Sequence, residues 1–437
     1  MSGVAQRAGS GETRTSHAGS GEALAQKRLR ELLALRTDAN ERFFATAAEP
    51  LARLCRLVAE RFTTGGRLLA IGQSPQARSD ARHVAVEFVH PVIVGKRALP
   101  ALALTGEGAT LANQVQLMAQ PQDVAMAFGA DAETVRALGV AAGRGCLTIA
   151  FEHTGAEWEL EPAAADSFVR QELTETAYHV LWELVHVFLE HRGGPAASTS
   201  RRAGEPAAAR EPGETATHEL GATAFLYPFL AKDGGESKRD SKDGSERLIA
   251  DVRGSIELKA REISQLREQT LGEGAQALIR AAAALRERLD AGATVLALGN
   301  GGSATDAMDA VADLRTPPRG WPARRAIDLS EDAAIVTAIA NDIGVDAVFR
   351  RQVIAHGRAG DILLAFSTSG GSANVIEALA QAHGMGMTTA AMVGYDGGEI
   401  AARGLADHVV VTRSQHIPRI QEAQAAAWHV LRELIEL

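Results

Sequence analysis

Hydrophobic and polar positions divide the chain into two ordered blocks that repeat the same succession of patterns. In the second block, about forty residues with a helical period precede five short apolar runs separated by helical patterns. These runs are TVLALG, RAIDLS, DILLAFS, TTAAMVG and HVVVT. Continuous runs of β-branched and leucine residues are typical of parallel strands buried on both faces. We therefore predict an α/β fold in which each block has two amphipathic N-terminal helices followed by a parallel-sheet, three-layer α/β/α sandwich.

The two blocks also match each other in sequence. The matching pairs are QELTETAYHVLWELV at 171–185 with QEAQAAAWHVLRELI at 421–435, GGRLLAIG at 65–72 with GATVLALG at 292–299, and SDARHVAVEF at 79–88 with TDAMDAVADL at 305–314. A shared helical heptad would explain the first match by chance, but it would not reproduce the same order of strand, turn and helix. The sequence therefore indicates a tandem duplication.

Changes in composition give the predicted boundaries. A polar tail expected to be disordered covers 1–22, the first block covers 23–192, a low-complexity linker covers 193–245, and the second block covers 246–437. Within the linker, AFLYPFL at 224–230 is an apolar exception. We expect it to dock on one of the folded domains, with a partner-binding segment as the alternative.

Charge and cysteine content restrict the functional classes. With 437 residues, a net charge of -9 and a pI near 5.9, the chain has no broad basic footprint for nucleic acid. The apolar runs are too short to span a bilayer, and the N-terminal residues lack the apolar core of a signal peptide. Only Cys55 and Cys146 occur, so neither a disulfide framework nor a cysteine zinc site is expected. These features favour a cytoplasmic protein without a membrane partner.

Two turns rich in glycine and serine carry the clearest chemical signal. LALGNGGSATD at 296–306 and FSTSGGSANV at 366–375 each follow a predicted strand and precede a helical pattern. Such turns present unpaired backbone N–H groups at the carboxyl edge of a sheet, where they favour an anion such as phosphate. No Walker lysine follows either turn, and GNGGS differs from GxGxxG, so the usual nucleotide sites fit poorly. Two ordinary serine and glycine turns are the alternative interpretation.

From about residue 246 onward, the chain resembles the sugar isomerase (SIS) family, and within it the phosphoheptose isomerases that act on sedoheptulose 7-phosphate. The resemblance is carried by GNGGSATDAMDAVADL at 299–314, TAIANDIG at 337–344, GDILLAFSTSGGSANVIEAL at 360–379 and RIQEAQAAAWHVL at 419–431. It implies a sugar phosphate as the ligand and an aldose-ketose isomerisation through an enediol. It also implies subunits that form tetramers, so we expect two of these chains to form a homo-oligomer, a dimer with four domains.

The resemblance assigns the substrate-binding positions to the second block. They are Asn300, Gly301, Gly302, Ser303, Asp342, Ser367, Thr368, Ser369, Ser372 and Gln421. The first block has GQSPQARSD and FGADAETV at the two loops and loses these groups. Asp131 and Glu133 stand where the phosphate would lie and should repel it. The first block is therefore not expected to bind phosphate by itself.

The resemblance also assigns catalytic and metal-binding positions, and it divides them between the blocks. Glu87, or otherwise Asp313, would remove the proton next to the carbonyl, and His179 or His429 would move protons on the oxygens. The zinc ligands of the family correspond to His83, Glu87, Gln171 and His179. The second block has Asp309, Asp313, Gln421 and His429, a set that would suit a harder ion or none.

These residues also have an alternative interpretation in which they serve only the structure. The two histidines at 179 and 429 are also explained as core residues of an amphipathic helix, and His83 with Glu87 as a solvated helical pair. Residues eight apart on a straight helix are about 12 Å apart, so Gln171 and His179 reach one ion only if Gln171 lies at the helix start or comes from another copy.

The complementary losses suggest one composite site per chain, in which His83 and Glu87 complete the phosphate site of the second block. Independent decay of the two blocks would leave the same residues. The function is therefore either sugar-phosphate isomerisation or, as the alternative, non-catalytic sugar-phosphate sensing or scaffolding. The substitution of Asp309 and Asp313 for the histidine and glutamate of the family favours the alternative.

Overall fold

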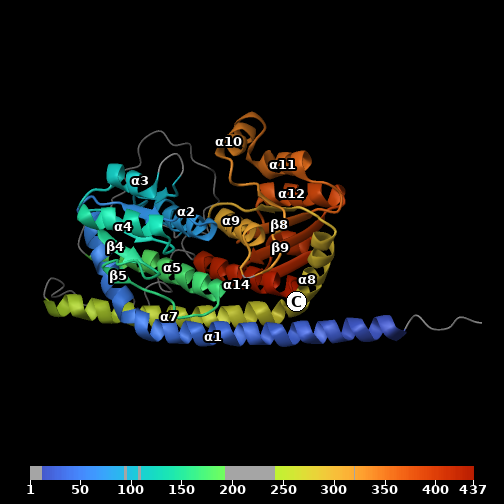
Figure 1. Ribbon diagram of the computed structural model, residues 1–437, viewed down its shortest axis with the longest axis horizontal. Coiled ribbons are helices and arrows are strands. Elements are labelled where there is room, and N and C mark those ends of the chain that lie inside the picture. Colours follow the sequence, from blue (N-terminus) through green and yellow to red (C-terminus); the bar gives the residue numbers. More distant parts are fainter. Residues whose placement is uncertain (1–11, 93–95, 107–109, 192–241, 319) are drawn as a thin grey trace, which may run out of the picture.

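The computed structural model describes residues 12–92, 96–106, 110–191, 242–318 and 320–437, and these form two α/β units (Figure 1). AFLYPFL and most of the predicted tail and linker lie outside the described residues. In the first unit the helices are α1 (Glu12–Thr63), α2 (Pro75–Val89), α3 (Leu111–Met118), α4 (Ala132–Gly143) and α5 (Ser167–His191). In the second they are α7 (Lys242–Glu273), α8 (Ala275–Asp290), α9 (Gly302–Arg315), α10 (Ala333–Asp342), a 3-10 turn (Val345–Ala347), α11 (Val348–His356), α12 (Ala373–Gly384), α13 (Gly398–Ala402) and α14 (Ile417–Ile435).

The described residues contain two five-stranded sheets with the same topology, and all strand pairs in both are parallel. The first sheet has the order β2-β1-β3-β4-β5, formed by β1 (Leu68–Ile71), β2 (Ala101–Leu104), β3 (Val124–Ala127), β4 (Leu147–Ala150) and β5 (Trp158–Glu159). The second has β7-β6-β8-β9-β10, formed by β6 (Val295–Leu298), β7 (Ala326–Asp328), β8 (Ile362–Ser367), β9 (Thr388–Gly394) and β10 (His408–Thr412). If β1 to β5 are taken as equivalent to β6 to β10 in chain order, the two strand orders are identical. The predicted fold class, with two tandem units, is confirmed.

The five strands predicted for the second unit are all present, and their central strands β6 and β8 are buried throughout. The helices before the first sheet differ from the prediction, because α1 is one helix of 52 residues where two helices were expected. In the second unit, Gly274 separates α7 from α8. The strand match places Ala47 at the equivalent position, and alanine favours a continuous helix where glycine weakens one.

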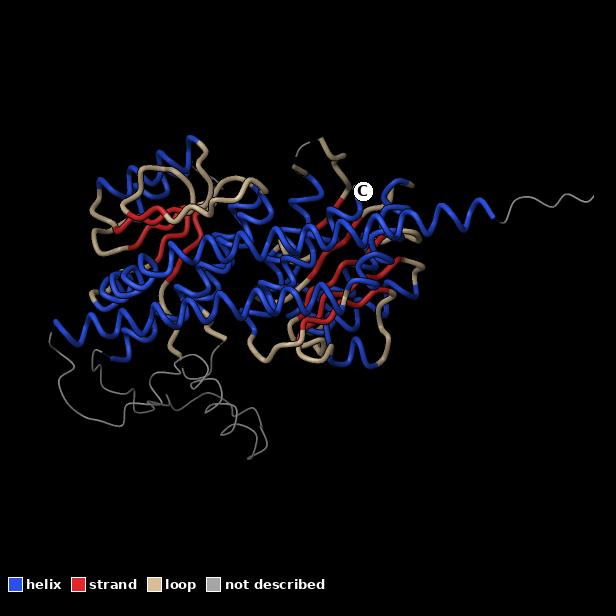
Figure 2. Tube along the Cα trace, turned by 90° about the horizontal axis from the view of Figure 1, so that it is seen from below, coloured by secondary structure: helices blue, strands red, loops and turns tan. Residues whose placement is uncertain are grey.

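The two long helices α1 and α7 lie side by side along the bottom of the molecule (Figures 1 and 2). Each crosses from one unit to the other. Leu29 and Leu32 of α1 belong to the core of the second unit, whereas its later residues pack in the first. Conversely, Ile249, Val252 and Ile256 of α7 are buried in the core of the first unit. The leading helix of each unit therefore completes the core of the other.

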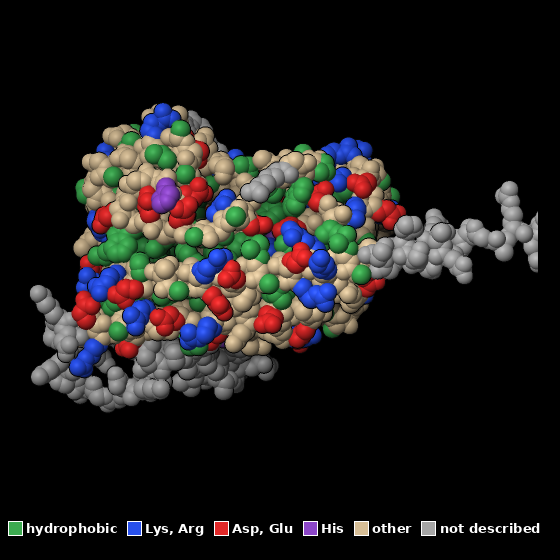
Figure 3. Space-filling model, turned by 60° about the horizontal axis from the view of Figure 1, so that its bottom comes forward, with side chains coloured by type: hydrophobic (Ala, Val, Ile, Leu, Met, Phe, Trp, Pro, Cys, Tyr) green, Lys and Arg blue, Asp and Glu red, His purple; other side chains and the backbone are tan. Residues whose placement is uncertain are grey.

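The outer face of these helices carries interspersed acidic and basic side chains (Figure 3). Some form pairs one helical turn apart, such as Arg42 with Asp38 at 2.6 Å and Arg53 with Glu49 at 2.8 Å. Such pairs keep the exposed face soluble while the opposite face is buried. In the described part of the chain, no helix has the length and apolarity needed to cross a membrane.

Candidate functional site

The two units meet where α2 packs against α9, next to the pair α5 and α14. Because α2 and α9 are the helices that follow the first strand of each sheet, their inner faces carry the matched positions of the duplication. His83 and Glu87 lie one turn apart on α2 and are 2% and 1% exposed. The structure therefore excludes the alternative of a solvated pair. Their Nε2 and Oε1 atoms are 4.0 Å apart.

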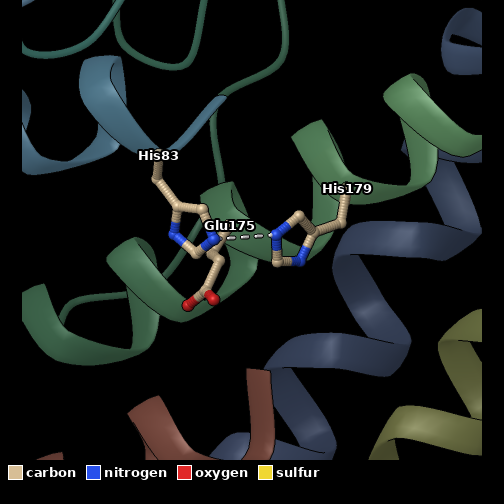
Figure 4. A group of neighbouring side chains, drawn as sticks. All are labelled: His83, Glu175 and His179. Atoms are coloured by element: carbon tan, nitrogen blue, oxygen red, sulfur yellow. Dashed lines mark hydrogen bonds between the residues drawn. The ribbon is translucent and has the colours of Figure 1, made fainter. Parts of the chain in front are cut away.

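His83 faces His179 of α5 and Glu175, which lies one turn before His179 on the same helix (Figure 4). The Nε2 atoms of the two histidines are 3.3 Å apart, and their rings meet edge to face. One carboxylate oxygen of Glu175 lies within 4.8 Å of both imidazole nitrogens. All three side chains are buried, and Oε1 of Glu175 has no hydrogen-bond partner among the described residues.

The second unit completes this group with Gln421 at the start of α14. Its Nε2 lies 3.3 Å from His83 Nε2, and its Oε1 makes no hydrogen bond to a described residue. Gly302, the first residue of α9, lies against the side chains of Gln421 and His83. A Cβ at this glycine would stand 1.9 Å from Gln421 Nε2 and 3.0 Å from His83 Nε2. The GNGGS loop of the second unit is therefore in direct contact with the histidines of the first.

A carboxylate from the second unit orients His179. Its Nδ1 lies 3.0 Å from Oε1 of Glu422, which also accepts two hydrogen bonds of 2.6 Å from Arg419. Because Glu422 already accepts from Arg419, it acts as an acceptor toward the imidazole as well, and the Nδ1–H of His179 donates to it. The Nε2 lone pair therefore points at His83. Burial, and to a smaller extent the neighbouring imidazole of His179, lowers the pKa of His83 well below its usual value, so the His83 ring is neutral.

The side chains of His83, His179, Glu175 and Gln421 fit a metal ion. Two nitrogens that bind a tetrahedral zinc ion at their normal bond lengths are about 3.3 Å apart. His83 and His179 show this separation, and Gln421 is equally close to His83. Rotation of the Gln421 amide by half a turn would present its unpaired oxygen to the ion. The unpaired Glu175 carboxylate would supply the negative charge.

Glu87 lies at the edge of this group and keeps one oxygen, Oε2, without a hydrogen-bond partner among the described residues. Burial raises its pKa to about 7, and the nearby charges of Glu183 and Glu422 add to the effect while His179 opposes it. A buried carboxylate whose pKa is near neutrality has the property required of a general base.

The positions that the duplication makes equivalent to His83, Glu87 and His179 are Asp309, Asp313 and His429, and we call them the mirror group. They lie at the other end of the interface and have different chemistry. Gln171 donates to Asp309 at 2.9 Å, and His429 Nδ1 lies 2.8 Å from Glu172. Asp313 accepts from Trp428 at 2.8 Å and lies 3.6 Å from His429 Nε2. The resemblance placed Gln171 beside His83 and Gln421 beside Asp309. The structure instead places Gln171 beside Asp309 and Gln421 beside His83.

The phosphate loops of the second unit end in helices whose first N–H groups are not capped by side chains. Gly301, at the cap position of α9 with a φ of 57°, has no side chain, and the side chain of Ser372, at the cap position of α12, makes no capping hydrogen bond. Asn300 and Asn374 exchange two hydrogen bonds of 2.9 Å, which hold the two loops together. Ser303 and Ser367 are buried at the loop ends. Helix starts without side-chain caps are the arrangement that the sequence predicted for anion binding.

Asp342, by contrast, is exposed at the end of α10, where it accepts a hydrogen bond from its neighbour Asn341. Thr368 lies in the loop after β8, and its carbonyl and the side chain of Ile420 both lie close to Gly394. In Ser369, the hydroxyl oxygen accepts from the N–H of Gly371 at 3.2 Å and shapes the turn.

In the first unit, acidic and hydroxyl side chains of the protein occupy the equivalent helix starts. Asp131 accepts from the N–H groups of Glu133 and Thr134 at the start of α4, at 3.1 and 3.0 Å. Ser74 caps α2 by accepting from Ala77. A carboxylate therefore takes the place of an external anion, which gives a structural reason for the expected loss of phosphate binding.

Sequence reasoning missed Glu175, Asn374 and the two glutamates that orient the histidines. Glu175 stands four residues before His179, a spacing that places both on one helix face and would have indicated it. Glu172 and Glu422 each follow a glutamine of the matched motif, but they act on the histidine of the other unit. No pattern in a single sequence shows that cross-unit pairing.

The family is shown by similarity to known proteins. Residues 260–394 match the family model described as the SIS domain. The phosphoheptose isomerase of Pelodictyon phaeoclathratiforme is 42% identical over 177 residues, which covers 40% of this chain and 83% of that protein. That of Pelobacter propionicus is 44% identical over 159 residues, covering 36% and 82%.

Similarity to solved structures extends over both units. The C-terminal domain of glucosamine-fructose-6-phosphate aminotransferase from Francisella tularensis superposes with a TM-score of 0.56 at 8% identity. This superposition covers 92% of the present chain and 93% of that chain, so it shows that the fold is shared over both α/β units. With two parallel sheets of one topology and relatives above 40% identity, the chain belongs to the SIS-domain family, with phosphoheptose isomerases among its relatives.

Proposed function

We propose that the protein is a sugar-phosphate isomerase of the phosphoheptose isomerase type, with sedoheptulose 7-phosphate or a related sugar phosphate as its substrate. The observation that carries the proposal is the contact at Gly302, where the uncapped phosphate loop of the second unit adjoins His83 and Gln421. The curated relatives are named phosphoheptose isomerases, which supports the same reaction class.

Substrate binding would use the second unit. The phosphate would lie at the starts of α9 and α12, where backbone N–H groups are free of side-chain caps and the serines of the loops add hydroxyl donors. The sugar would then extend toward His83 and Glu87. Because these side chains are buried, the reacting carbons would be removed from bulk water.

The proton transfers would use the first unit. Glu87, with a pKa of about 7, would take the proton from the carbon next to the carbonyl and return it to the neighbouring carbon. His179, whose tautomer is fixed by Glu422, would assist proton movement on the oxygens of the enediol. Asp313 is the mirror position, but it faces a part of the interface without uncapped phosphate loops.

Zinc is proposed as the resident metal, held by His83, His179, Gln421 and Glu175. When bound, it would supply Lewis acidity that polarises a substrate oxygen. This assignment leaves Glu87 free to act as the base, whereas the resemblance to the family implied both the base role and a metal-binding role for Glu87. It also replaces Gln171 by the glutamine of the other unit.

The test is incubation with sedoheptulose 7-phosphate, with and without added zinc, with the product followed by NMR. We expect turnover by the native protein, loss of turnover in Glu87→Gln, and retention in the mirror variant Asp313→Asn. The reverse pattern, with turnover in Glu87→Gln and none in Asp313→Asn, would place the base on the other side of the interface.

The second candidate is a binding protein without catalysis. The specific observation in its favour is that Asp309 and Asp313 replace a histidine and a glutamate at the mirror group. One of the two equivalent positions in the chain therefore lacks the side chains that the resemblance associates with metal binding and catalysis. Thermal stabilisation by sedoheptulose 7-phosphate without turnover under any metal condition would support this candidate and overturn the isomerase.

A further inference from the structure

A cavity of about 290 Å³ lies at the mirror position, between the carboxyl edge of the first sheet and α9 of the second unit. Its walls come from α2, from the loops after β3 and β4, from the first half of α5 and, in the second unit, from Asp313, Thr316 and Pro318. By the duplication, it corresponds to the proposed substrate pocket. Its volume is near the lower end of the range found for small-molecule sites and suits a single sugar ring.

The ionisable side chains that face this cavity are mainly acidic, and burial raises the pKa of each of their carboxyl groups. Asp80, Glu152 and Asp313 contribute carboxylates, and Arg170 contributes a guanidinium whose Nη1 already donates to the carbonyls of residues 164 and 165. Asp131, which caps α4 nearby, is close enough to contribute to the raised pKa of Glu152. An added phosphate would therefore meet carboxylates at every side where the other unit offers N–H groups.

One buried carboxylate oxygen in the wall has no hydrogen bond. Asp313 is 1% exposed; its Oδ2 accepts from Trp428, while its Oδ1 makes no hydrogen bond to a described residue, although Gln76 faces the same carboxylate. An unsatisfied oxygen at this depth is costly unless a donor comes from a ligand or solvent. It marks the point where a positively charged donor would be bound most strongly.

Aromatic rings form the rest of the wall. Phe128 and Phe151 stack at 5.5 Å, and Phe168 stacks on His429 at 4.3 Å. The faces of aromatic rings attract cations and pack against the apolar faces of sugar rings. Ser74, Gln76 and Thr174 add groups that bind hydroxyls.

We propose that this cavity is a second ligand site, for a sugar-sized molecule that carries hydroxyl groups and an ammonium group but no phosphate. The ammonium would bind Asp313 Oδ1 and the carboxylates of Asp80 and Glu152, and the ring would pack against Phe128 and Phe151. This assignment is independent of the isomerase proposal, because it rests on the group that lacks the histidine pair and the uncapped phosphate loops.

Calorimetric titration of the full chain with glucosamine, glucose and glucosamine 6-phosphate tests the proposal. We expect glucosamine to bind at least about tenfold more tightly than glucose, since glucose has the same ring but no charge. Asp313→Asn and Glu152→Gln should each weaken glucosamine on the order of tenfold, while Ser372→Ala, in the phosphate loop of the other unit, should not.

Three results would overturn the proposal. One is equal affinity for glucose and glucosamine. Another is weakening by Ser372→Ala but not by Glu152→Gln, which would place the amine in the sugar-phosphate pocket. The last is a Glu152→Gln variant that binds glucosamine 6-phosphate no more tightly than the native protein does, since a repelling carboxylate predicts a gain for the phosphate. Circular dichroism of Asp313→Asn separates loss of binding from loss of folding, and Glu152, which is partly exposed, provides the variant that folds in either case.

Discussion

Replacing Glu87 by glutamine should change how the stability of the protein depends on pH. In the folded state this carboxyl group has a pKa of about 7, compared with a usual value of 4.5, so the folded protein holds its proton over a range in which the unfolded chain has lost it. Stability therefore falls as the pH rises through this window. The difference corresponds to about 3 kcal/mol over the whole window, and to about 2 kcal/mol between about pH 5.5 and about pH 8.5.

The assay is urea unfolding followed by circular dichroism at several pH values, with a chelator present so that only protein groups titrate. Relative to the native protein, Glu87→Gln should become more stable by about 2 kcal/mol on going from about pH 5.5 to about pH 8.5, because glutamine does not ionise. Glu41→Gln, on the exposed face of α1, serves as the control and should follow the native profile. Parallel profiles for native protein and Glu87→Gln would refute the argument that burial suppresses ionisation at this position.

Three other substitutions test the site. Gly302→Ala would bring a Cβ within 1.9 Å of Gln421 Nε2, so kcat measured by NMR should fall on the order of a hundredfold, whereas Gly254→Ala, with open space around it, should leave kcat unchanged. Glu422→Gln removes the charged acceptor of His179 Nδ1, and zinc affinity measured by competition with a chromophoric chelator should fall about tenfold or more; an unchanged affinity would exclude zinc binding by His179. Asp131→Ala removes the cap of α4 and should cost about 1 kcal/mol in urea unfolding without changing sugar-phosphate affinity, so a stronger effect on affinity than on stability would contradict a purely structural role.

The fold could be predicted largely because its signals are local. The strands β6 to β10 follow from apolar runs that need no knowledge of their neighbours, and the shared topology follows from the repeat. The periodic pattern predicted two helices before each sheet, whereas the first unit has the single helix α1 and the second unit has α7 and α8. The interruption at Gly274 has no counterpart in α1, which continues through Ala47 and Pro50, and the apolar pattern does not record this difference.

The site could be predicted only as far as the helices that carry it. The positions of His83, Glu87 and His179 followed from motifs, but their partners lie across the interface between the units. Because α5 and α14 are related by the duplication, Gln171 and Gln421 are equivalent in sequence, and only the packing of the units decides which glutamine meets which histidine. Caps such as Asp131 were recognised as repulsive, although the structure shows that this carboxylate fills the anion position itself.

The crossing of α1 and α7 has a consequence for inheritance. In an assembly of identical separate chains, every substitution appears in all copies at once, so equivalent pockets must change together. Here two copies share one covalent chain, and each supplies a leading helix to the core of the other. A histidine can thus become Asp309 on one side while His83 persists on the other, and the two kinds of pocket stay in a fixed ratio of one to one in every molecule.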